Sequence, residues 1–140
     1  MPVHFFNEDH DYRPDNQTKL TAWLALIASK YSFQISDLNY ILCSDDFLLN
    51  INKQYLNHDY YTDIITFDNS DEEGTIEGDI FISIDRVNEN ATTLGIPFDE
   101  EFQRVLAHGI LHLIGFNDKS ESEKKVMTEK EEACLSLLHK

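Results

Sequence analysis

The chain has 140 residues, of which 41% are hydrophobic and 26% are charged. This length and composition are typical of one globular domain with its own core, so we expect a single domain over residues 1–140. Acidic residues number 26 and basic residues 11, which gives a formal net charge of −15. Because Lys and Arg supply most of the affinity for phosphate, this balance excludes a uniformly basic surface for nucleic acid.

Targeting and membrane segments are not predicted. The N-terminal region lacks the basic and apolar stretches of a secretory signal, and no apolar run approaches the roughly 20 residues of a membrane span. Cys43 and Cys134 match no thiolate zinc pattern, so we expect two buried, reduced thiols. The sequence therefore predicts a cytoplasmic protein that does not associate with membranes.

Hydrophobic periodicity predicts alternating strands and helices in the first half of the chain. Short strands are expected at residues 3–6, 40–43 and 63–67, because these runs are rich in β-branched and aromatic residues. An apolar stripe from Leu20 to Tyr31 predicts a first helix. Ser44 is expected to cap a second helix, whose core-facing side chains are predicted to be Leu48, Ile51 and Tyr55.

The second half predicts one further strand and three helices. The strand covers residues 78–84, where isoleucines alternate. A short helix follows and is predicted to end at Gly95, with Val87, Ala91 and Leu94 facing inward. Another begins after Pro97. The last opens with Ser120 and Glu123 as a capping box and is expected to bury Val126, Met127, Cys134, Leu137 and Leu138. The fold predicted is α+β, a small mixed sheet of about four strands packed with about five helices.

Two histidines in one predicted helix are the most informative feature of the chain. His108 and His112 lie four residues apart, a spacing that stacks both imidazoles on one helix face. Gly115 is predicted to end this helix and to let the chain turn back, which brings Asp118 toward the rings. Two imidazoles and one carboxylate leave a coordination position open, as a catalytic zinc ion requires. The segment therefore predicts one zinc ion bound by His108, His112 and Asp118 in a metal-dependent hydrolase.

A simpler interpretation of this spacing is a pair of core histidines with hydrogen-bonded rings. The helix is apolar nearly all round, which predicts burial, and a metal ion would satisfy both imidazoles at once. In the peptidase pattern H-E-x-x-H the Glu is a general base, but here Gly109 occupies its position. A peptidase is therefore disfavoured, and hydrolysis must use a metal-activated water or a base from elsewhere in the chain.

With these residues in view, the chain resembles the YbeY endoribonuclease family. The family signature H-G-x-L-H-L-x-G-[YF]-D-H is similar to His108-Gly-Ile-Leu-His-Leu-Ile-Gly-Phe-Asn-Asp118. Three upstream blocks also match, namely Ile51-Asn-Lys-Gln-Tyr-Leu-Asn-His-Asp59, Thr62-Asp-Ile-Ile-Thr-Phe67 and Gly78-Asp-Ile-Phe-Ile-Ser83. The resemblance implies a zinc-dependent, single-strand-specific endoribonuclease of ribosomal RNA, including the 3′ end of the small-subunit RNA. It also implies a role in ribosome quality control, association with the small ribosomal subunit and contact with a ribosome-assembly GTPase.

Two positions depart from the family pattern. The family's third His ligand falls on Asp118, whose carboxylate is also an ordinary zinc ligand. The family's Arg falls on Leu56, which can neither bind phosphate nor stabilise a transition state. The cations predicted to bind substrate in its place are Arg104, Lys53 and His58.

Arg104 and Asp63 each have a second interpretation. Arg104 shares a helix face with His108, but it is equally suited to an ordinary surface ion pair with Glu100 or Glu101. Asp63 is predicted to be a base or the partner of a ligating His, or else a cap at the strand start.

Two other functions stay open. One is a metal-dependent hydrolase of peptides or small molecules, which Gly109 disfavours. The other is a ribosome-assembly factor without nuclease activity, which keeps its metal for stability alone and which Leu56 favours.

Overall fold

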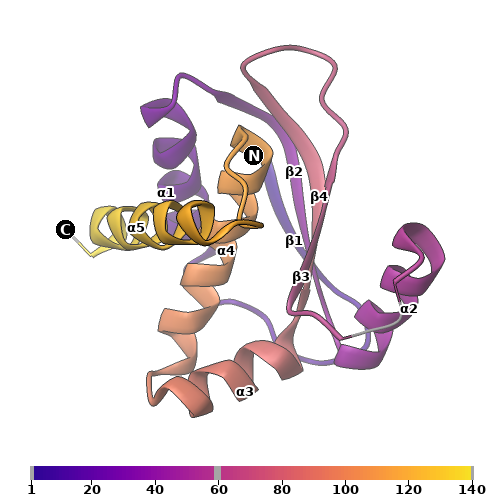
Figure 1. Ribbon diagram of the computed structural model, residues 1–140. Coiled ribbons are helices and arrows are strands. Elements are labelled where there is room, and N and C mark those ends of the chain that lie inside the picture. Colours follow the sequence, from indigo (N-terminus) through magenta and orange to yellow (C-terminus); the bar gives the residue numbers. More distant parts are fainter. Residues whose placement is uncertain (1, 59–60, 140) are drawn as a thin grey trace.

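The computed structural model describes residues 2–58 and 61–139, and this part of the chain forms four strands and five helices (Figure 1). In chain order they are β1 Val3–Asn7, α1 Gln17–Lys30, β2 Gln34–Cys43, α2 Asp45–Leu56, β3 Ile64–Asp68, β4 Thr75–Ser83, α3 Ile84–Leu94, α4 Phe98–Ile114 and α5 Glu121–Leu138. The predicted α+β fold is confirmed.

The four strands form one mixed sheet in the order β1-β2-β4-β3. β2 pairs in parallel with both β1 and β4, whereas β3 runs antiparallel to β4. The β3–β4 register places Ile64 opposite Ile82 and Thr66 opposite Ile80. β3 is therefore an edge strand with one side free of any partner strand in the described part of the chain.

The two faces of the sheet are covered unequally. α1, α4 and α5 lie together on one face, and α2 lies on the other (Figure 1). The larger core forms between the sheet and the three helices, and it includes Tyr40, Ile80 and Leu106, all fully buried. A smaller cluster under α2 contains Cys43, Leu48 and Ile65. Successive β3 side chains alternate between these clusters, as a strand requires: Ile64 packs against the larger core and Ile65 belongs to the smaller.

Several predicted details are wrong. Three side chains expected in the core are exposed: Tyr55 at 65%, Leu94 at 59% and Val126 at 41%. α2 is a partial cover, so the Tyr55 ring meets Phe67 edge-to-face, with ring centroids 6.0 Å apart. Leu94 is the last residue of α3 and lies beyond its buried turns.

Several predicted strand boundaries also differ from the structure, and β4 begins at Thr75 rather than at Gly78. β2 starts at Gln34 rather than at Tyr40. The sequence pattern did not reveal its first half because that half is polar on one face and contains a register shift between Ile35 and Asp37. Ile84 begins α3 instead of ending β4.

Other local predictions are confirmed. Gly95 ends α3 with a φ of 69°, a left-handed conformation that glycine adopts without steric cost. Ser120 and Glu123 form the reciprocal capping box of α5. Cys43 and Cys134 are both buried and unpaired. Within the described ranges, no helix combines the length and apolar character needed to cross a membrane.

Candidate metal centre

α4 carries both histidines of the site. Three acidic residues in its first turn favour the helix start, where the backbone dipole is positive. The helix packs its buried face on β3 and β4, and Gly109 lies there against Ile80 and Ile64. The imidazoles of His108 and His112 lie on the helix face beside this contact, with their ring centroids 4.5 Å apart and their planes at 81°.

The turn after α4 brings the third side chain back. Gly115 has a φ of 127°, and its N–H donates to the carbonyls of Leu111 and His112. Phe116 N–H also donates to Leu111, so the last carbonyls of the helix are satisfied while the chain reverses. Asp118 consequently returns to the two rings, as the sequence predicted.

The three donor atoms converge on one point. His108 Nε2 lies 3.0 Å from His112 Nε2. Asp118 Oδ2 lies 3.3 Å from the His108 nitrogen and 3.5 Å from the His112 nitrogen. Two ligands that each lie about 2.1 Å from a tetrahedral ion are roughly 3.4 Å apart. A set of two imidazole nitrogens and one carboxylate oxygen at these separations fits a zinc-class ion.

The group lies at the surface and is open on one side. The exposed fraction of the side chain is 16% for His108, 23% for His112 and 38% for Asp118. Three protein ligands with a solvent-facing side match a catalytic rather than a closed structural zinc site.

A buried chain of ion pairs lies behind His108. Glu131 Oε2 lies 2.5 Å from His108 Nδ1, and Glu131 Oε1 accepts a hydrogen bond of 2.9 Å from Arg104. The same guanidinium donates to both oxygens of Glu101, at 2.8 Å and 2.5 Å. Glu101 is fully buried and Glu131 is 4% exposed. Each carboxylate is thus compensated by Arg104, as buried charges must be.

The two imidazoles differ in their affinity for protons. Burial opposes a charge on His108, but the hydrogen bond and charge of Glu131 outweigh it and hold the pKa of His108 above its ordinary value. Burial and the neighbouring His108 lower the pKa of His112. A lowered pKa favours the neutral imidazole, the form in which a histidine binds a metal ion. A metal ion bound at His108 would displace a proton wherever the ring carries two.

The predicted substrate-binding cations lie in different surroundings. Arg104 directs three hydrogen bonds to carboxylates, so the alternative of an ion pair with Glu101 is present, although Glu101 is fully buried rather than at the surface. A phosphate-binding role for Arg104 stays a prediction. Lys53 lies on α2 and His58 follows its end. Asp59, the last residue of the matching upstream block, is outside the described residues.

A hollow of about 220 Å³ lies beside β3, and Leu56 and His58 line it together with Ile64. Ile64 also contacts the α4 backbone, since a Cβ placed on Gly109 would lie 3.0 Å from Ile64 Cδ1. Because Gly109 adjoins His108 in sequence, the Ile64 side chain lies between this hollow and the helix segment that carries His108.

Asp63 lies close to the same charges. Burial raises the pKa of its carboxyl group, and the nearby charges of His108 and Arg104 only partly offset that effect. This neighbourhood favours the interpretation of Asp63 as a base or as a partner of the histidines.

Sequence reasoning offered Glu101 as a partner of Arg104 but missed Glu131 and its contacts with His108 and Arg104. A signal was present: Glu131 falls on the buried stripe of α5, which consists of Met127, Glu131, Cys134 and Leu138. A carboxylate at such a position needs a buried partner.

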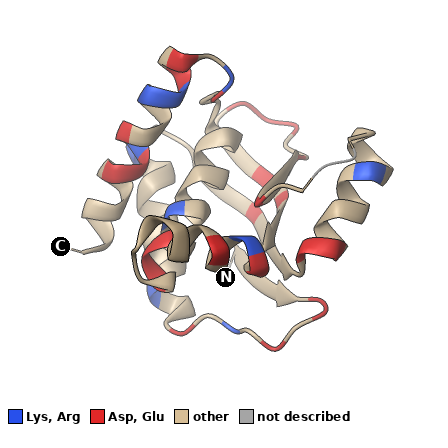
Figure 2. Ribbon diagram, turned by 60° about the horizontal axis from the view of Figure 1, so that its bottom comes forward, with Lys and Arg blue, Asp and Glu red and all other residues tan. Residues whose placement is uncertain are grey.

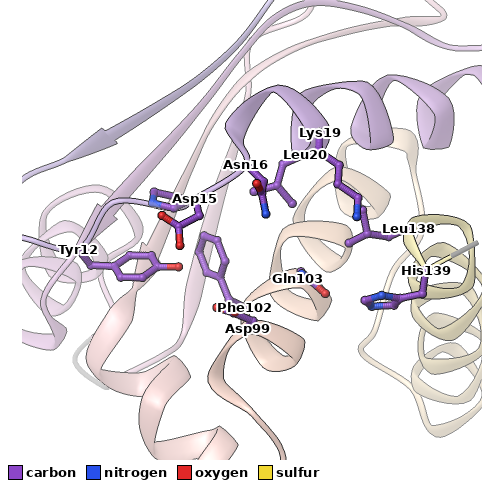
Figure 3. A pocket seen from close by; sticks show the side chains of 11 residues that line it. Tyr12, Asp15, Asn16, Lys19, Leu20, Asp99, Phe102, Gln103, Leu138 and His139 are labelled. Atoms are coloured by element: carbon purple, nitrogen blue, oxygen red, sulfur yellow. The ribbon is translucent and has the colours of Figure 1, made fainter.

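Another hollow, of about 110 Å³, lies away from the histidines. It is framed by the start of α1, the first turns of α4 and the end of α5, with Tyr12, Lys19, Gln103 and His139 among its lining residues (Figure 3). The metal-binding group does not contribute to it.

Fold and site together define an α+β protein with a surface His-His-Asp group suited to a divalent metal. A family model described as "Endoribonuclease YbeY" matches residues 4–139. A protein of Cytophaga hutchinsonii named "Endoribonuclease YbeY" is 53% identical over 135 residues, covering 96% of this chain and 94% of its own. A protein of the same name from Parabacteroides distasonis is 43% identical over 99% of this chain and 96% of its own. The chain belongs to the YbeY endoribonuclease family.

A solved structure supports the same relationship. The solution structure of a Thermotoga maritima protein is 27% identical and superimposes with a TM-score of 0.68, covering 97% of this chain and 88% of the other. The fold is therefore shared over nearly the whole length.

Proposed function

We propose that this protein is a metal-dependent endoribonuclease that hydrolyses phosphodiester bonds of single-stranded RNA in the cytoplasm. The observation that carries the proposal is the convergence of His108, His112 and Asp118, whose ligand atoms all lie within 4.8 Å of one another on an open surface. The names of the relatives support RNA as the substrate.

The chemistry that a bound zinc ion supplies is polarisation of a phosphoryl oxygen and activation of a water molecule near neutral pH. The protein's own residues would orient the RNA and accept or donate the protons that the reaction moves. Gly109 offers no proton acceptor, so the carboxylate of Asp63 is the residue proposed to accept a proton. The hollow beside β3 that Leu56 and His58 line is proposed to receive the RNA, with Lys53 and His58 as cations along its path.

Ribosomal RNA is the proposed substrate, with cleavage near the 3′ end of the small-subunit RNA. Acidic residues are spread over most elements, whereas Lys and Arg are few and scattered (Figure 2). This surface offers little general attraction for RNA. We therefore propose that the small ribosomal subunit, and a ribosome-assembly GTPase, help to deliver the substrate, and that the enzyme contributes to ribosome quality control.

The test is cleavage of a single-stranded RNA that carries the 3′ region of the small-subunit sequence. The parent protein should cleave it, a chelator should stop cleavage, and added zinc should restore it. His112→Ala should be inactive. His139 is an exposed histidine that follows the C-terminal end of α5, so the control variant His139→Ala should cleave like the parent. A parent that binds zinc but leaves RNA intact contradicts the proposal.

A second candidate function is a ribosome-assembly factor that keeps the metal for stability alone. The observation in its favour is Leu56, which stands where the family has an Arg. Zinc-dependent stability and binding to small-subunit particles, without cleavage of any RNA, would support this function.

A further inference from the structure

We propose that Glu131 is a positioning residue that holds His108 in the tautomer a metal requires, and that Arg104 and Glu101 hold Glu131 in turn. The inference rests on the metal site of the proposed function. It adds a role for three residues that do not themselves contact the ion.

The geometry of Glu131 excludes it as a fourth ligand. One of its oxygens faces His108 Nδ1 at 2.5 Å and the other accepts from Arg104 at 2.9 Å. The ligand atoms of the site are on the far edge of the His108 ring, where Nε2 faces His112 Nε2. Glu131 therefore acts on the site only through the imidazole.

The chemistry of the pair selects one tautomer. An ionised carboxylate has no proton to donate, so a neutral His108 must place its proton on Nδ1 and donate it to Glu131. The lone pair is then on Nε2, which lies 3.3 Å from Asp118 Oδ2 and is aimed at the ligand group. Orientation by a carboxylate of this kind sets the ring and its basicity in metal sites generally.

Arg104 keeps Glu131 in the form that this role needs. A carboxylate that is 4% exposed would tend to take up a proton, and a protonated Glu131 could donate to Nδ1 instead of accepting from it. The guanidinium prevents this by hydrogen bonding to Glu131 Oε1. Glu101 binds the other nitrogens of the guanidinium as a two-pronged pair, which fixes the direction of the fork.

A purely structural role would give different results. If the network served only to tie α4 to α5, loss of the Glu131 charge would lower stability but leave the folded protein's zinc affinity unchanged. A positioning role predicts a change in affinity and in the protonation of the His108 ring.

The test compares Glu131→Gln with Glu132→Gln, the same change at the neighbouring, exposed position of α5. Zinc affinity is measured on folded, metal-stripped proteins by competition with a chromophoric chelator. Because an amide can either accept from Nδ1 or donate to it, Glu131→Gln should bind zinc about 10–100-fold more weakly. Glu132→Gln should bind like the parent. Equal affinities of the two variants would overturn the proposal.

A second measurement needs neither a variant nor the metal. Nitrogen-15 chemical shifts of the imidazoles in the metal-free parent are followed upward in pH until the His108 ring, whose pKa is raised, has lost its second proton, and they then report which ring nitrogen keeps the remaining one. His108 should show a protonated Nδ1, and a protonated Nε2 with a bare Nδ1 would overturn the proposal even if Glu131→Gln failed to fold. Neither measurement uses RNA, so a protein that binds zinc through an oriented His108 but cleaves nothing would contradict only the nuclease function.

Discussion

Gly109 packs so closely on Ile80 that a Cβ atom on the glycine would lie 2.9 Å from Ile80 Cδ1. Ile80 is fully buried on β4, and Ile64 on β3 crowds the same point at 3.0 Å. A glutamate, the residue that peptidases of the H-E-x-x-H type place between their two histidines, cannot fit there. The sheet itself thus excludes that mechanism.

Gly109→Ala should destabilise the protein. Alanine gains about 1 kcal/mol of helix propensity over glycine, but crowding three isoleucine methyl groups in a dense core costs about 1–3 kcal/mol. We expect a net loss of about 1 kcal/mol in the free energy of unfolding by urea. Adding Ile80→Val, which removes one of the crowding methyl groups, should recover part of that loss. If Gly109→Ala were as stable as the parent, the isoleucine side chains would have to move aside without cost, contrary to this prediction.

Metal removal should lower thermal stability. A ligand that binds only the folded state stabilises it by mass action, by about 2.7 kcal/mol at a concentration 100 times its dissociation constant. The melting temperature with zinc should therefore exceed that with a chelator. His108→Ala should melt at one temperature in both conditions, and superimposable curves for the parent would contradict the coupling.

Arg104→Ala should be more destabilising than an ordinary loss of an ion pair. It leaves Glu101 and Glu131 buried without a compensating charge, and breaking buried pairs costs about 3–5 kcal/mol. Because the Arg104 side chain is itself 31% exposed, we expect the lower end of that range.

The matched control is Arg86→Ala, which breaks the more exposed pairs with Asp45 and Glu89 and should cost about 1 kcal/mol or less. Urea unfolding measures both variants. Equal losses would mean that solvent, rather than Arg104, compensates the two glutamates.

Leu56→Arg should raise the rate of RNA cleavage. Leu56 is 40% exposed at the end of α2 and lines the hollow beside β3, so a guanidinium there can reach a phosphate in that hollow. One added electrostatic stabiliser is worth up to about 100-fold in rate. Leu94→Arg, at the exposed end of α3, is the control and should leave the rate unchanged. If both variants cleave alike, substrate does not pass Leu56.

The two thiols should resist modification in the folded protein. Burial raises the pKa of Cys43 to about 12 and that of Cys134 to about 11, so few thiolates form near neutral pH. A chromogenic disulfide reagent should label neither cysteine until urea is added, and both afterwards. Prompt labelling of the native protein would indicate that one of these sites opens locally.

The grouping of His108, His112 and Asp118 was predictable because its geometry is local. The spacing of His108 and His112 and the helix-ending Gly115 determine where Asp118 returns, and each of these signals is contained within a few turns of chain. Glu131 escaped prediction because its contact with His108 depends on how α5 docks on α4. Such docking is a tertiary property that helical periodicity alone does not specify.

The core was predicted less evenly than the helices. Periodicity identified the buried residues of α1, which is covered along its length, but it also assigned Tyr55 and Val126 to the core. An apolar residue at a core-like spacing is buried only if another element covers it. α2 faces a sheet with no second helix beside it in the described part of the chain (Figure 1), so Tyr55 remains in solvent.

The order of the elements along the chain has a consequence for synthesis. The ligand segment ends at Asp118, whereas the carboxylate that orients His108 belongs to α5, which the ribosome adds afterwards. A nascent chain therefore exposes its three candidate ligands before the Glu131 carboxylate, which we propose selects the proton position on His108, has been added. If Glu131 orients His108 as proposed, the site reaches its full affinity for a metal ion only once α5 has been made and has docked on α4.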